Sequence, residues 1–169
     1  MKEILIAAVS AFFGVVAGLS LEWWKSSRSQ TAALCDEFCS VIAEAADAGA
    51  QYWLMAGVDP QAPLWETRLH GFQRRITGYN VLLTGRLHDD ALDEIQTSLA
   101  HLFTKLTGGE FGEPTRAPDV VNAKCVQDQA GESILSIRRG FFDTVSFQET
   151  LWRRLSRFRP TKPHPWFGE

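Results

Sequence analysis

Residues 4–21 read ILIAAVSAFFGVVAGLSL, a run of 18 residues without a charged side chain. A membrane-spanning helix needs about 20 apolar residues, within a working range of roughly 17–25. Trp23 and Trp24 follow the run after Glu22, and Lys25 and Arg28 come next; these tryptophans and cations are residue types that favour the lipid headgroup layer. The sequence therefore predicts a transmembrane helix here, with these four residues at the membrane interface.

Two alternative interpretations of this run stay open. A cleaved signal peptide is one, with Lys2 as a minimal basic region, although the run exceeds the usual apolar region of about 7–15 residues. A buried helix of a soluble fold is the other, although such a helix normally keeps a polar stripe. Two cations follow the run and one precedes it, which favours a cytoplasmic C-terminal domain. We therefore expect a single-pass protein of the inner (cytoplasmic) membrane, with lipid bilayer as one partner.

Small residues recur every four positions within the run, at Ser10, Gly14 and Gly18. Small side chains on one helix face let two helix backbones approach closely in lipid, and residues 14–18 form a GxxxG motif. This pattern predicts a helix–helix interface, whose partner is either a second copy of the chain or another membrane protein.

Four segments with helical periodicity follow the run, and no segment shows the alternation of a strand. Their apolar positions are spaced three and four apart, except for one gap of six after Val145: Leu34, Phe38, Val41, Ala45, Ala48, Tyr52 and Met55; Trp65, Leu69, Phe72, Ile76, Tyr79 and Leu83; Leu92, Ile95, Leu99, Leu102 and Leu106; Ile134, Ile137, Phe141, Val145, Leu151, Leu155 and Phe158. Short connections between such segments are typical of an antiparallel four-helix bundle. The predicted fold class is all-α.

The segments divide the chain into an anchor (1–27), a helical bundle domain (28–158) and a proline-rich tail (159–169) that we expect to be disordered. No glycine or proline lies between Glu22 and Ala48, so anchor and first bundle helix are expected to form one rod of about 75 Å. Either Asp89 or Asp90 is the expected N-cap of the third bundle helix.

Charge is distributed unevenly along the chain. Residues 36–132 hold 15 acidic and 7 basic residues, whereas residues 133–162 hold 7 basic and 2 acidic residues. The predicted basic surface consists of Arg138, Arg139, Arg153, Arg154, Arg157 and Arg159. These arginines either neutralise the acidic helices of the bundle or face anionic lipid or another polyanion.

Signatures of catalysis or of cofactor binding are missing from the sequence: there is no Walker-type loop, no GxGxxG, no HExxH and no GxSxG. Cys35 and Cys39 share a helix face and would be one edge of a metal site, but two buried cysteines are the commoner explanation. A pI near 5.8 argues against nucleic acid as a partner. We therefore expect no catalytic residue, no cofactor and no metal, and whether the bundle takes a small-molecule ligand stays open.

The leading functional hypothesis is a non-enzymatic, membrane-anchored interaction module, an accessory subunit or adaptor that assembles as an oligomer through its span and its bundle. This architecture is shared by many small bacterial membrane proteins. The alternative is a membrane sensor or effector triggered by a ligand or a partner, of which phage-defence effectors are an architectural analogue. A pocket lined by convergent polar groups favours the sensor, and an exposed apolar patch favours the adaptor.

Overall fold

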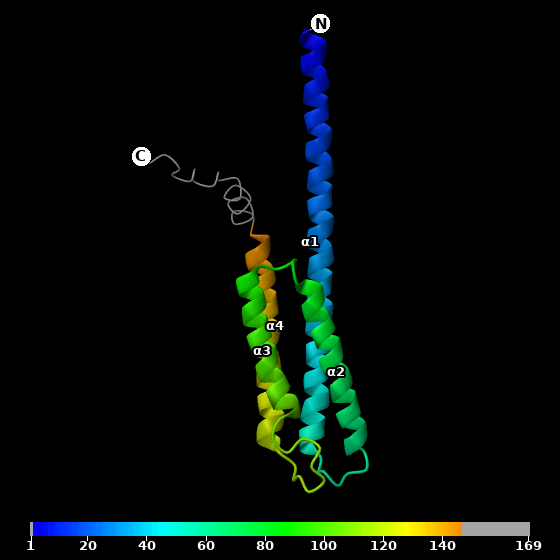
Figure 1. Ribbon diagram of the computed structural model, residues 1–169, viewed down its shortest axis with the longest axis vertical. Coiled ribbons are helices and arrows are strands. Elements are labelled where there is room, and N and C mark those ends of the chain that lie inside the picture. The colour runs from blue at the N-terminus through cyan, green and yellow to red at the C-terminus, as the bar shows by residue number, and fades with distance from the viewer. Residues whose placement is uncertain (1, 147–169) are drawn as a thin grey trace, which may run out of the picture.

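The computed structural model describes the backbone of residues 2–146 and the side chains of residues 18–20 and 22–146. It contains four helices, α1 (Lys2–Leu54), α2 (Ala62–Leu83), α3 (Asp89–Thr107) and α4 (Val120–Val145), and no strand over that range. The helices lie side by side along one axis, and α1 projects far beyond the other three (Figure 1). The predicted all-α bundle of four helices is confirmed.

The first helix is a single rod of 53 residues, about 80 Å long at 1.5 Å per residue. The expectation of an uninterrupted helix through Glu22 and Ala48 is confirmed. Among residues 18–30, every described side chain except that of Trp24 is exposed, and burial begins at Thr31. The second half of α1 therefore belongs to the bundle, whereas the first half stands outside it (Figure 1).

Across the side chains that the structure describes, no helix combines the length and the apolar character needed to cross a membrane. Most of the predicted span falls on residues 1–17 and 21, whose side chains lie outside the described part of the chain. The structure therefore gives the predicted transmembrane helix no support.

The N-terminus of α3 differs from the sequence-based expectation. His88 is the N-cap, and its Nδ1 accepts a hydrogen bond of 3.3 Å from the backbone N–H of Asp90. Asp89 and Asp90 instead lie in the first turn, where carboxylates are favoured by the positive end of the helix dipole without capping it. The prediction of an aspartate cap was therefore wrong by one or two residues.

The last helix is capped by Asp119, whose side chain accepts a hydrogen bond of 2.8 Å from the backbone N–H of Asn122. The helix ends at Val145. The predicted continuation to residue 158 and the predicted tail fall on residues 147–169, which lie outside the described part of the chain.

Helix α1 packs most extensively, because it buries two stripes rather than one. One stripe faces α2, where the ring of Phe38 stacks on that of Tyr79 with centroids 5.4 Å apart. The other faces α4 and α3, where Gly49 meets Val126 and Leu106. Helices α3 and α4 also share a broad interface, whereas the contact between α2 and α3 is slight.

Helix α4 buries a stripe of mostly small residues that the sequence pattern did not reveal. The buried positions are Ala123, Val126, Ala130, Ser133, Ile137 and Gly140. Ile134 and Phe141, which the apolar pattern placed in the core, are only partly buried. A Cβ on Gly140 would lie 3.0 Å from the Cβ of Ala91. The small side chains thus allow α4 to lie close to α3 and α1.

Candidate functional site

The predicted membrane-interface residues lie on the part of α1 just outside the bundle. The Trp23 side chain is 68% exposed, and Lys25 and Arg28 are also exposed. The guanidinium of Arg28 lies 5.6 Å from the centroid of the half-buried Trp24 ring, a cation–π distance. Cationic and aromatic side chains therefore lie on the turns where α1 leaves the other helices, and Arg28 and Trp24 contact each other there.

The predicted helix–helix interface is described only at Gly18. This glycine is exposed, and a Cβ there would meet no atom within 4 Å. The side chains of Ser10 and Gly14 lie outside the described residues. The bundle itself therefore leaves the Gly18 position open.

Only two of the six arginines of the predicted basic surface are described, and both contact the bundle. Arg139 forms an ion pair of 3.2 Å with Glu94 of α3. Arg138 lies beside Cys39 of α1, where its charge and its hydrogen bond act on the thiol. At Arg139 the charge is neutralised within the bundle. The remaining members of this surface fall outside the described residues: Arg153, Arg154, Arg157 and Arg159.

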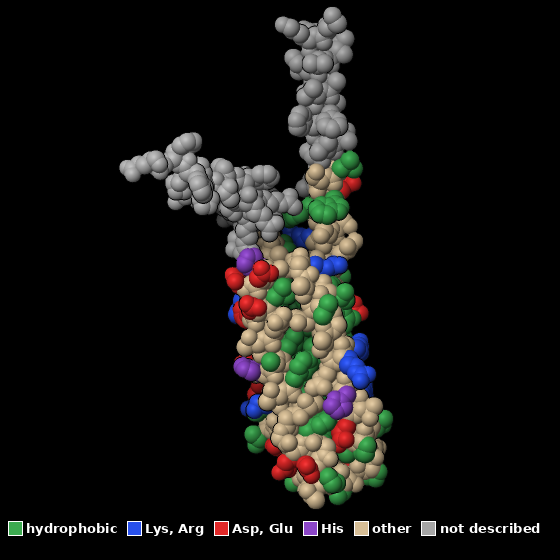
Figure 2. Space-filling view, in the orientation of Figure 1, with side chains coloured by type: hydrophobic (Ala, Val, Ile, Leu, Met, Phe, Trp, Pro, Cys, Tyr) green, Lys and Arg blue, Asp and Glu red, His purple; other side chains and the backbone are tan. Residues whose placement is uncertain are grey.

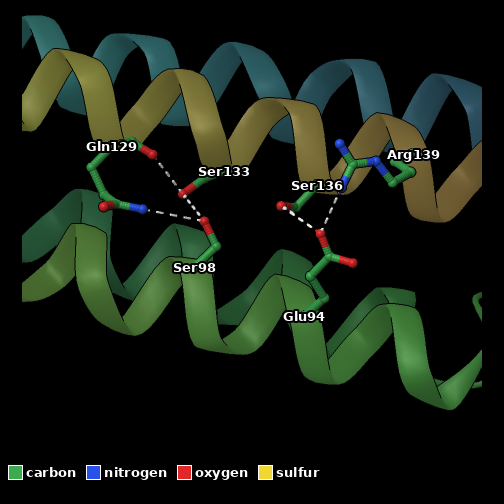
Figure 3. Close-up of polar contacts among 6 residues, drawn as sticks. All are labelled: Glu94, Ser98, Gln129, Ser133, Ser136 and Arg139. Carbon is green, nitrogen blue, oxygen red and sulfur yellow. Dashed lines mark hydrogen bonds and ion pairs between the residues drawn. The ribbon is translucent and has the colours of Figure 1, made fainter.

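A polar groove of about 510 Å³ runs between α3 and α4. Ser98 is one of the residues that line it, and Ser98 Oγ lies 2.9 Å from Oγ of the buried Ser133 (Figure 3). Ser133 Oγ also donates to the backbone carbonyl of Gln129 at 3.0 Å, and Gln129 Nε2 donates to Ser98 Oγ at 3.5 Å. The hydroxyl groups are therefore satisfied within the protein, which is what makes their burial tolerable.

The mouth of this groove is acidic. Asp93, Glu94 and Glu132 line it together with His101. Glu94 is held by Arg139 and by Ser136, whose Oγ donates to Glu94 Oε1 at 3.3 Å (Figure 3). Within the described residues no three His, Cys, Asp or Glu side chains come together as metal ligands would. The groove offers hydrogen-bond acceptors and negative charge to a polar or cationic small molecule.

The cysteines of α1 are buried in the core, as their helical spacing predicted for structural cysteines. Burial, with smaller contributions from Cys39 and Asp36, raises the pKa of the Cys35 thiol to about 11. Burial also raises the pKa of Cys39, although Arg138 opposes this effect. Both groups are thus neutral thiols at physiological pH, and neutral thiols are poor nucleophiles and poor metal ligands.

One buried charge was not anticipated from the sequence. Arg116 lies in the loop between α3 and α4, in a stretch rich in glycine and proline, yet it is only 3% exposed. Its guanidinium donates to the backbone carbonyl of Tyr52 at 3.0 Å and lies 4.2 Å from the Tyr52 ring centroid. In the sequence, an arginine within such a loop carries no pattern that distinguishes a buried side chain from a solvated one.

Comparison of the chain with protein-family models, with curated proteins and with solved structures found no match. The class of protein is therefore defined by the fold alone: a helical bundle in which one helix is extended far beyond the other three.

Proposed function

We propose that the protein is a membrane-anchored helical-bundle interaction module, an accessory subunit or adaptor without enzymatic activity. The observation that carries this proposal is the continuity of α1, which links the bundle core to the uncharged residues 4–21. A lone apolar helix outside a bundle leaves a large apolar surface without cover, and lipid or another apolar helix would cover it. We place the span in the inner membrane and the bundle on its cytoplasmic side.

Apolar side chains on the bundle support the assignment as an interaction module. Figure 2 shows such side chains in the middle of the face between α3 and α2, two helices with only a slight mutual contact. Further large apolar side chains are exposed around the end of the bundle farthest from residue 2: Leu54, Val58, Leu64, Val120 and Val121. Exposed apolar surface of this kind is typical of protein–protein contacts.

Membrane fractionation combined with native sizing tests this proposal. The full chain should stay with membranes through a carbonate wash, whereas a chain without residues 1–22 should be released. Replacing Gly14 and Gly18 together by Leu should leave carbonate resistance unchanged, because Leu is more apolar than Gly. The same change should weaken self-association or partner binding by about 1–2 kcal/mol, since it separates two helix backbones.

Release of the full chain by carbonate would show that residues 4–21 do not anchor it in the membrane. A mature N-terminus near residue 20 would identify a signal peptide instead. A double leucine variant with the same native size as the parent would show that the small-residue face takes no part in the assembly.

The groove between α3 and α4 favours a second candidate, a ligand-triggered sensor whose bundle signals through α1. Ser98, whose hydroxyl group pairs with that of Ser133, lines this groove together with acidic side chains. Thermal unfolding with polyamines, which are cationic and carry several hydrogen-bond donors, tests this candidate. A rise in the unfolding midpoint that Glu132→Gln abolishes would favour the sensor, and an unchanged midpoint would count against it.

A further inference from the structure

A second recess lies where α1 leaves the bundle, against the turn between α2 and α3. It has a volume of about 390 Å³, and Trp23, Ser26, Ser27 and Gln30 of α1 form one wall. Arg86 lies on the opposite wall, in the turn. We call it the α1–turn cleft.

The turn that carries Arg86 is held in place by backbone geometry. Gly85 has a φ of +79°, a conformation that L side chains rarely adopt. The backbone N–H groups of Arg86 and Leu87 both donate to the carbonyl of Leu83, at 2.9 and 3.2 Å. The arginine is therefore attached to an ordered turn beside α1.

The chemistry of the α1–turn cleft is that of an anion site. Arg86 is the one charged residue that lines it, and no described carboxylate does. Two serine hydroxyl groups and the Gln30 amide supply neutral donors. Arginine is suited to phosphate because its planar guanidinium donates two parallel hydrogen bonds.

The surroundings add both positive charge and acidic groups. Lys25 and Arg28 are exposed on the same turns of α1. Glu22 is exposed one turn before Ser26, and Asp90 pairs with His88 at 3.4 Å at the start of α3. Successive residues are about 100° apart around a helix, so Lys25 and Arg28 lie on the side of α1 turned away from the lining residues, and Glu22 lies nearer to them. Arg86 is therefore the cation that faces the cleft, whereas Asp90 is engaged at a helix terminus.

Apolar side chains lie next to the cleft on the side of residues 4–21. Leu19 and Trp23 are both largely exposed on α1. A ligand with an anionic headgroup and an acyl chain would contact Arg86 and these apolar side chains together. An inorganic anion would contact only Arg86.

We propose that the α1–turn cleft binds the headgroup phosphate of an anionic phospholipid, with Arg86 as its principal ligand. This inference rests on the proposed membrane anchoring, because the cleft meets lipid only if residues 4–21 lie in the bilayer. Bound lipid would fasten the turn between α2 and α3 to the membrane surface and restrict tilting of the bundle around α1.

The test uses the full chain in nanodiscs made of equal parts phosphatidylcholine and phosphatidylglycerol, with native mass spectrometry of the lipid that the protein retains. The parent should retain phosphatidylglycerol over phosphatidylcholine. Arg86→Gln should lower this preference on the order of fivefold, the effect expected for one arginine at an anionic surface. Arg86→Lys should keep part of it.

Arg74→Gln is the matched control. Arg74 is an exposed arginine in the middle of α2, remote from the cleft, and its replacement removes the same charge. Circular dichroism should show equal helicity in all variants, and all should resist carbonate extraction.

Four results would overturn the inference. Equal retention of the two lipids by an inserted parent would remove the headgroup site and leave the membrane anchor in place. An equal loss in Arg74→Gln would show a general charge effect. Displacement of retained lipid by soluble glycerol phosphate would show that the cleft recognises phosphate without acyl chains. Extraction of the parent itself by carbonate would instead show that the proposed anchoring has failed, and the inference with it.

Discussion

Arg116 is buried at the end of the bundle that lies farthest from residue 2, where it binds the last turn of α1. Its guanidinium donates to the carbonyl groups of Tyr52 and Trp53, which belong to the last turn of α1 and lack partners within the helix. No described carboxylate lies within ion-pair distance of it. The charge is instead stabilised by the negative end of the α1 dipole and by two aromatic rings. One side chain thus attaches the loop before α4 to the end of α1.

At the same scale, the buried thiols make stability depend on pH. The pKa of Cys35 is raised to about 11 from 9.0, so the folded chain keeps its proton where the unfolded chain loses it. Stability is therefore unaffected below pH 9 and falls as the pH rises from 9 toward 11, by about 2 kcal/mol at most. Thermal midpoints measured across this range should fall more steeply in the parent than in Cys35→Ala.

Cys125→Ala is the control for this measurement, because Cys125 is not fully buried. Its thermal midpoint should fall with rising pH as steeply as that of the parent. The hydrogen bond to Glu37 raises the pKa of Tyr79. This adds the same pH dependence of stability to the parent, to Cys35→Ala and to Cys125→Ala. If the thermal midpoint of Cys35→Ala fell as steeply as that of the parent, the buried Cys35 thiol would not be the cause of the pH dependence.

At the scale of the element, α1 needs a glycine where it meets α3 and α4. A Cβ at Gly49 would lie too close to a Leu106 methyl group and 3.1 Å from Val126 Cγ1. Leu106 and Val126 are themselves fully buried, so neither has free space to move into. The glycine thus sets the distance between α1 and its two neighbours.

Replacing Gly49 by Ala should lower the thermal midpoint by several degrees. Overpacking of a filled core costs about 1–3 kcal/mol, which exceeds the gain of roughly 0.5–1 kcal/mol from the higher helix propensity of alanine. Gly71→Ala in α2 is the matched control, because a Cβ there meets nothing within 4 Å. That variant should be slightly stabilised. Equal effects of the two changes would show that the contact at Gly49 is not tight.

At the scale of the whole molecule, the bundle and the projecting half of α1 are joined without a flexible linker. No described side chain between residues 18 and 30 is fully buried, whereas the core begins at Thr31 and Cys35. Rotation or tilting of the outer half must therefore be transmitted to the bundle through a continuous helix.

A chain that begins at residue 23 should accordingly keep its bundle. It lacks none of the buried side chains, so its helix content per bundle residue and the cooperativity of its unfolding should match those of the full chain. Far-UV circular dichroism and thermal unfolding measure both. Loss of cooperative unfolding in the truncated chain would show that residues 1–22 contribute to the core.

The sequence by itself determined the helices, because helical periodicity and its interruption are local properties. The positions of Phe38, Ile76 and Leu99 in the core follow from spacings of three and four. Continuity of α1 follows from the absence of glycine and proline between residues 22 and 48. The acidic segment 36–132 and the basic segment 133–162 were also visible in the sequence, and the ion pair between Arg139 and Glu94 connects them.

Only the tertiary structure decided which polar and small residues are buried. Ser98 and Ser133 resemble surface residues in sequence, yet each satisfies the other across the seam between α3 and α4. Gly140 marks a close approach of two helices that no local pattern encodes. Arg116 is buried because a loop returns to the end of α1. Such placements depend on which groups another helix or loop brings into contact, and that information is spread over residues far apart in the chain.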